Sequence, residues 1–184
     1  MTTILKFYRN ALKKYPLITS SIQTSSLMVA GDIIAQTAIE ANSLKNINLL
    51  RTSQFGVVGL FLVGPTLTTW YKVLDKYLGN KGTSAVLKKV AFDQGLFAPT
   101  FIVVFLTSLA IVQQKNVESS INELKTNYKD ILIANYKLWP LVQVCNFYVV
   151  PVQYQILVVQ FVALTWNTYL SWKTQGSNLK EISN

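Results

Sequence analysis

The sequence predicts an all-α, multi-pass membrane helix bundle, with four spans plus one amphipathic or re-entrant helix. Residues 138–172 contain no charged side chain over 35 consecutive positions. As one helix this run would reach about 52 Å, well beyond the roughly 30 Å hydrocarbon core of a bilayer. Pro140 and Pro151 each remove a backbone donor, so the run is predicted to break into two elements. Charged residues make up only 14% of the 184-residue chain, against roughly 25% in soluble domains.

The N-terminal segment, residues 1–15, carries four basic and no acidic side chains. Its larger apolar residues share one helical face, namely Leu5, Tyr8, Leu12 and Tyr15. This basic amphipathic pattern is typical of a helix lying on a membrane surface. Two interpretations stay open, an uncleaved mitochondrial targeting helix and a juxtamembrane interfacial helix.

Four windows that follow are long and apolar enough to cross a bilayer. Their approximate bounds are 16–39, 52–73, 91–114 and 152–172. A fifth apolar element at 128–150 carries three charged residues, so crossing fully, lying in the interface and re-entering all remain open for it. The predicted bundle therefore covers residues 16–172, and a polar C-terminal tail covers residues 173–184.

The formal charge of +9 resides mainly between the apolar windows. This distribution favours contact with the lipid bilayer and its anionic lipids rather than with nucleic acid, and a homo-oligomer is a further possibility. With four spans, the positive-inside rule places both termini on the cytoplasmic or matrix-like face. A fully crossing fifth element would instead move the C-terminus to the opposite face.

The chain lacks the residues that most enzyme mechanisms require. It has no histidine and only one cysteine, Cys145, which excludes Ser-His-Asp and Cys-His arrangements and an internal disulfide. Its glycines do not form a phosphate-binding loop. An aspartyl pair of Asp32 and Asp93 is the remaining catalytic idea, but it carries no specific motif. We therefore expect no enzyme activity, no cofactor and no metal site.

Two carboxylates, Asp32 and Asp93, fall inside predicted spans, where insertion costs about 2.5–3.5 kcal/mol each. Other polar residues follow them, or one another, at intervals of four or seven, a spacing that keeps side chains near one helix face. The candidate pathway-lining residues are Asp32, Gln36, Asp93, Thr100, Thr107, Gln153, Gln160 and Asn167. We expect these faces to converge inside the bundle, either as hydrogen bonds between helices or as a hydrated pathway.

Further residues predict how the spans pack. Pro65 and Pro99 should bend the second and third spans and are candidate hinges. Gly31, four residues before Ala35, should let another helix approach closely. Arg51 is expected either to pair with a carboxylate or, as is commoner, to extend to the headgroups. Aromatic residues near the span ends are expected to act as interface anchors, among them Trp70, Trp139, Trp166 and Trp172.

Several short motifs recur in a fixed order along the chain. They include Gly31-Asp32, Gly64-Pro65, Trp70-Tyr71, Asp93-Gln94, Trp139-Pro140, Val150-Pro151 and the run from Trp166 to Ser171. In order and spacing they resemble the family of small peroxisomal and mitochondrial membrane proteins of the Mpv-seventeen and yeast Sym-one type. The resemblance covers nearly the whole chain.

The resemblance implies a multi-pass protein of the mitochondrial inner membrane, with the peroxisomal membrane as the alternative location. It implies a channel-like protein that passes ions or small metabolites and is linked to mitochondrial DNA maintenance and to tolerance of stress and ethanol. It also favours a pathway over purely structural hydrogen bonds for the polar faces. The competing function is a non-conducting structural or scaffold membrane protein.

Overall fold

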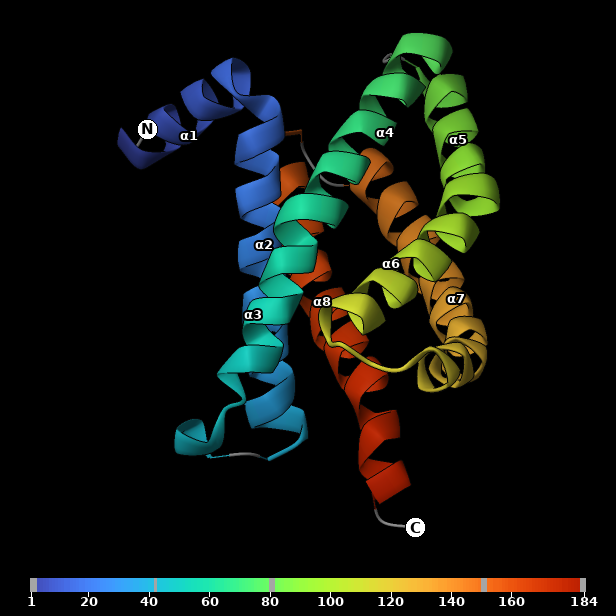
Figure 1. The fold of residues 1–184 in the computed structure, drawn as a ribbon. Coiled ribbons are helices and arrows are strands. Elements are labelled where there is room, and N and C mark those ends of the chain that lie inside the picture. The colour runs from blue at the N-terminus through green and yellow to red at the C-terminus, as the bar shows by residue number, and fades with distance from the viewer. Residues whose placement is uncertain (1–2, 42, 80–81, 150–151, 183–184) are drawn as a thin grey trace.

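The computed structural model describes residues 3–41, 43–79, 82–149 and 152–182, whose regular structure is entirely helical. In chain order the elements are α1 (Thr3–Lys14), α2 (Pro16–Ile34), η1 (Ala35–Ile39), η2 (Leu44–Asn46), α3 (Leu49–Val58), η3 (Gly59–Val63), α4 (Gly64–Leu78), α5 (Thr83–Phe92), η4 (Asp93–Phe97), α6 (Ala98–Val112), α7 (Val117–Tyr148) and α8 (Val152–Ile182). They form an elongated bundle, with α1 turned aside at one end (Figure 1). The predicted all-α class is confirmed.

Two consecutive rods of this bundle share one plan. Each joins a ten-residue α-helix, a five-residue π-helical turn and a fifteen-residue α-helix. The second residue of each fifteen-residue helix is a proline, Pro65 in α4 and Pro99 in α6. Both rods, Leu49–Leu78 and Thr83–Val112, are long and apolar enough to cross a membrane.

In these two rods the π-helical turns, η3 and η4, lie where the prolines would disturb an α-helix. Proline has no N–H, and its ring clashes with the carbonyl four residues earlier. In each rod the residue before the proline instead bonds five residues back, with the Gly64 N–H donating to the Gly59 carbonyl and the Ala98 N–H to that of Asp93. The rods therefore continue past their prolines through one widened turn.

The uncharged run 138–172 holds two elements, as predicted, because α7 ends at Tyr148 and α8 begins at Val152. Pro140 does not interrupt α7, which continues through it for a total of 32 residues; Pro151 lies outside the described residues. The helix begins at Val117, where the Asn116 side chain accepts a hydrogen bond from the Ser119 N–H at 2.7 Å, a typical N-cap. The apolar element predicted at 128–150 is thus the C-terminal part of a longer helix that packs against α6 and α8.

The first and last helices end at opposite ends of the bundle (Figure 1). An even number of crossings would bring both termini to one face, so the arrangement agrees with the alternative in which the fifth element crosses fully. The structure supports two candidate spans by length and composition within its described residues. The count of four spans is not confirmed.

Helix α2 packs closely against two neighbours through glycine. A Cβ on Gly31 would lie 2.7 Å from the Cβ of Asn167 in α8, and a Cβ on Gly64 would lie 2.5 Å from the Cα of Ser21 in α2. Both distances are shorter than a side chain tolerates, so the expected close approach at Gly31 is confirmed. The adjoining core contains Met28, Phe55, Val58, Ile102, Phe105, Leu106, Leu109, Ile131 and Leu170.

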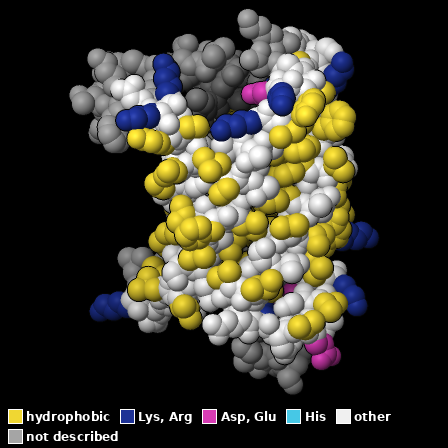
Figure 2. Space-filling view, turned by 45° about the horizontal axis from the view of Figure 1, so that its top comes forward, with side chains coloured by type: hydrophobic (Ala, Val, Ile, Leu, Met, Phe, Trp, Pro, Cys, Tyr) yellow, Lys and Arg dark blue, Asp and Glu magenta, His cyan; other side chains and the backbone are white. Residues whose placement is uncertain are grey.

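Large apolar side chains also cover the outside of the bundle. Phe61 and Phe161 are each 73% exposed. Figure 2 shows hydrophobic side chains over the middle of one face and most Lys and Arg side chains toward its two ends. This banded surface suits a bilayer, in which an apolar belt faces acyl chains and charges face headgroups.

Candidate functional site

A cavity of about 510 Å³ lies inside the bundle between α2, α4, α7, α8 and the η4–α6 segment. We call it the central cavity. It extends along the half of the bundle where α4 approaches α5, and its far end is lined by Met28, Ile102, Phe105 and Leu170, which belong to the hydrophobic core. Acidic and amide side chains line it from α2, α4, η4, α7 and α8, namely Gln23, Asp75, Asp93, Gln94, Asn135, Gln143, Gln160 and Asn167.

The π-helical turn η4 supplies Asp93 and Gln94, two consecutive residues that both line the cavity. Trp70 Nε1 donates to Asp93 Oδ1 at 2.9 Å, and Gln94 Nε2 donates to Asp93 Oδ2 at 2.8 Å. Asn135 Nδ2 in turn donates to Gln94 Oε1 at 2.7 Å. This hydrogen-bonded series joins α4, η4 and α7 across one side of the cavity. Single π-helical turns within α-helices often occur at functional sites.

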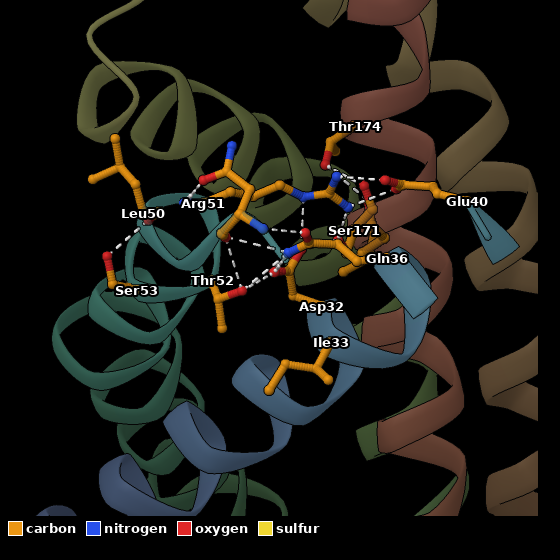
Figure 3. Close-up of polar contacts among 12 residues, drawn as sticks. Asp32, Ile33, Gln36, Glu40, Leu50, Arg51, Thr52, Ser53, Ser171 and Thr174 are labelled. Carbon is orange, nitrogen blue, oxygen red and sulfur yellow. Dashed lines mark hydrogen bonds and ion pairs between the residues drawn. The ribbon is translucent and has the colours of Figure 1, made fainter. Parts of the chain in front are cut away.

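A second polar group surrounds Asp32, away from the cavity lining (Figure 3). Its members come from α2, η1 and the residue that follows η1, α3 and α8. We call them the closed-end cluster: Asp32, Gln36, Glu40, Arg51, Thr52 and Ser171. Arg51 Nε donates to Asp32 Oδ1 at 2.7 Å, and the Arg51 guanidinium also contacts both Glu40 oxygens at 2.7 and 2.8 Å. Of the two expectations for Arg51, the structure confirms pairing with a carboxylate, since Arg51 pairs with Asp32 and Glu40. Extension to the headgroups is not observed.

Asp32 is fully buried and fully hydrogen-bonded. Besides Arg51, it accepts from Ser171 Oγ at 2.5 Å, Thr52 Oγ1 at 2.6 Å and Gln36 Nε2 at 2.8 Å. Four donors use the whole acceptor capacity of a carboxylate. The Asp32 carboxylate therefore holds protein groups together and offers no free oxygen to a solute.

The predicted pathway residues separate into three groups. The cavity brings together Asp93, Gln160 and Asn167, whereas Asp32 and Gln36 belong to the closed-end cluster. Two others lie on the exposed surface of α6, Thr100 and Thr107. The side chain of Gln153 is outside the part that the structure describes.

The two threonines are displaced for a physical reason. The expected shared face with Asp93 assumed an uninterrupted α-helix, but the π-helical turn η4 begins at Asp93 and ends before Thr100. A π-helical turn holds an extra residue, which rotates everything after it relative to everything before it. The seven-residue spacing consequently does not carry the polar face of η4 into α6.

Sequence reasoning missed part of the cavity wall. It treated Trp139 and Trp166 as interface anchors, but both line the central cavity, with ring centroids 6.2 Å apart. Trp70 likewise bonds Asp93. Only Trp166, which precedes Asn167, stands next to a predicted pathway residue in the sequence. Among the described residues, no group of three or more His, Cys, Asp or Glu side chains is arranged to hold a metal ion.

Comparisons with known proteins identify relatives along nearly the whole chain. A family model described as the Mpv17 / PMP22 family matches residues 110–171. The chain is 42% identical to the mitochondrial inner membrane protein Mpv17 of Danio rerio, covering 94% of this chain and 98% of the relative. It is 41% identical to the Homo sapiens protein of that name, covering 90% and 94%, and 39% identical to protein sym-1 of Neurospora crassa, covering 92% and 98%.

No solved structure matches the chain at a significant level. The sequence relatives alone are nevertheless decisive, because each is about 40% identical over nine-tenths or more of the chain. Their names agree with the expected location in the mitochondrial inner membrane. The resemblance inferred from the short motifs is confirmed, and the chain belongs to the Mpv17 / PMP22 family.

Proposed function

We propose that this chain forms a pathway for ions or small metabolites across the mitochondrial inner membrane. The observation that carries the proposal is the central cavity, a space of about 510 Å³ whose walls combine apolar and aromatic side chains with acidic and amide ones, within helices whose outer faces are apolar. Polar groups at membrane depth are costly unless they meet protein or water. A cavity that collects them provides space for water and solutes within the bundle.

The proposed membrane arrangement has five crossings rather than four. Helices α2–η1, α3–α4, α5–α6, α7 and α8 run along the bundle, with the first and last helices ending at opposite ends (Figure 1). The apolar belt of the outer surface would lie in the bilayer (Figure 2). Helix α1 would lie on the membrane surface with its basic residues toward anionic headgroups.

The cavity is closed at the end nearest the hydrophobic core. Core residues such as Met28 and Phe105 form its floor, and beyond them the closed-end cluster ties α2, α3 and α8 together. Passage of a solute therefore requires this end to open. Asp93 in the wall of the cavity would favour cations, while Asp32 would act by holding the closed end.

The test is reconstitution of the purified protein into bilayers, with measurement of current and of ion selectivity from the reversal potential. We expect Asp93→Asn to lower the preference for cations while the protein still inserts. Asp130→Asn is the matched control, because Asp130 is an exposed residue paired with Lys173 on the bundle surface. Unchanged selectivity in Asp93→Asn would assign this carboxylate to packing.

The competing function is a non-conducting scaffold that stabilises membrane complexes. The closed end favours it, since the structure contains no described opening through that half of the bundle. A reconstituted protein that passes neither current nor labelled solute under any tested condition would support the scaffold and overturn the pathway. Neither function requires a catalytic residue.

A further inference from the structure

Asp93 is a charged group in the described bundle interior that has few hydrogen-bond partners. Its carboxylate accepts two hydrogen bonds, from Trp70 and Gln94, of the roughly four that a carboxylate can accept. No cationic side chain of the described residues forms an ion pair with it. A partly buried carboxylate without a cation is unfavourable, so this wall of the cavity is suited to a positively charged ligand.

The other charged residues of the cavity do not supply that charge to Asp93. Asp75 is itself paired with Lys89. Lys72 lines the cavity two residues beyond Trp70 on α4 and is exposed, so water can solvate its ammonium group. Asp93, deeper in the wall, therefore remains the cavity residue that a bound cation would stabilise most.

The walls around Asp93 are aromatic. Trp70, Phe97 and Phe101 form a stacked series with successive ring centroids 4.8 and 4.9 Å apart. Phe97 and Phe101 line the cavity together with Trp139 and Trp166. Aromatic faces attract organic cations through their quadrupole and through dispersion.

A bare inorganic cation fits this site less well. Ca²⁺ takes six to eight oxygen ligands and Mg²⁺ about six. Beside Asp93 the nearest amide oxygen, Gln94 Oε1, already accepts a hydrogen bond from Asn135. An organic ammonium needs only a few acceptors for its N–H groups, and its apolar part gains contact with the rings.

We propose that the central cavity binds a small organic ammonium ion, whose nitrogen donates to the Asp93 carboxylate while its apolar part contacts the aromatic walls. The volume of about 510 Å³ is within the range of roughly 300–1,000 Å³ that is usual for small-molecule sites. The inference rests on the proposed pathway and names its solute class.

The experiment uses three probes that share one ring and differ in charge: phenethylamine, 2-phenylethanol and 3-phenylpropanoate. Their binding to the full-length protein in detergent is measured by calorimetry. We expect phenethylamine to bind, and the neutral and anionic probes to bind roughly thirtyfold or more weakly, because they leave the carboxylate unpaired. Equal binding of all three, or no binding of phenethylamine, overturns the inference.

Variants locate the binding. Asp93→Asn should weaken the binding of phenethylamine by roughly thirtyfold or more. Asp93→Glu should retain part of the affinity, and the exposed-surface variant Asp130→Asn should retain all of it. Undiminished binding in a folded Asp93→Asn protein places the amine elsewhere and sinks the assignment. Because binding is measured without a membrane, failure here leaves the conductance test untouched, and a non-conducting protein can still bind the amine.

Discussion

At the scale of residues, Asp32 and Asp93 show how one side-chain type takes two roles. Asp32 is fully buried, accepts four hydrogen bonds and meets the guanidinium of Arg51. Asp93 accepts two hydrogen bonds beside a cavity. The first carboxylate has its charge compensated by protein, and the second accepts only the hydrogen bonds of Trp70 and Gln94; the proposed function assigns it to a solute.

Arg51 tests the structural role of the closed-end cluster. Arg51→Gln removes the cation that faces both Asp32 and Glu40, whose side chains are 0% and 11% exposed. Breaking a buried pair from one side costs about 3–5 kcal/mol, because the remaining charge stays buried without a partner. We expect a lower midpoint of thermal unfolding in detergent.

Lys45→Gln is the control for Arg51→Gln, since Lys45 is an exposed residue in the same connecting region. It should leave the unfolding midpoint nearly unchanged. Adding Asp32→Asn to Arg51→Gln should recover part of the loss, as the buried charge is then removed. An Arg51→Gln protein as stable as the parent would contradict the assigned ion pair.

At the scale of elements, the contact between α2 and α8 depends on the absence of one side chain. Gly31 faces the backbone and Cβ of Asn167. We expect Gly31→Ala to separate the two helices and to cost about 1–3 kcal/mol of unfolding free energy. Gly95→Ala is the matched control, because nothing lies within 4 Å of a Cβ at Gly95. Equal unfolding free energies for the two variants would refute the close packing.

The π-helical turn before Pro99 determines where Asp93 and Gln94 lie. With Pro99→Ala the clash and the missing donor are removed, so the rod can return to regular α-helix. We expect the hydrogen-bonded series from Trp70 to Asn135 to be disrupted and solute flux in liposomes to fall, while insertion persists. Pro140→Ala is the control, since α7 passes Pro140 as an α-helix. Normal flux in Pro99→Ala would show that the turn is not required.

At the scale of the whole molecule, the positions of the two ends determine topology. Helix α8 ends at the end of the bundle opposite α1 (Figure 1). We expect tags on the two termini to lie on opposite faces of the membrane. Protease protection of each tag in intact and permeabilised mitoplasts measures this. If both tags are protected under the same conditions, they lie on one face, and the number of crossings is even.

The sequence alone was sufficient wherever an inference depended on composition or on an uninterrupted helix. Long uncharged windows predict immersed helices, because unpaired backbone polar groups are costly in lipid. Gln160 and Asn167 are seven residues apart on α8, which contains no π-helical turn, and both line the cavity as their spacing predicts. Gly31 likewise predicts a close helix contact. The motifs in their order were enough to identify the family.

Only the tertiary structure decided which polar residues meet. The register of α6 depends on the extra residue in η4, which moves Thr100 and Thr107 to the outer surface. The partner of Asp32 in α8, Ser171, is 139 residues away in sequence, beyond any local pattern. Periodicity describes one helix face, whereas the fate of a buried charge depends on donors that neighbouring helices bring to it, and those are fixed by packing.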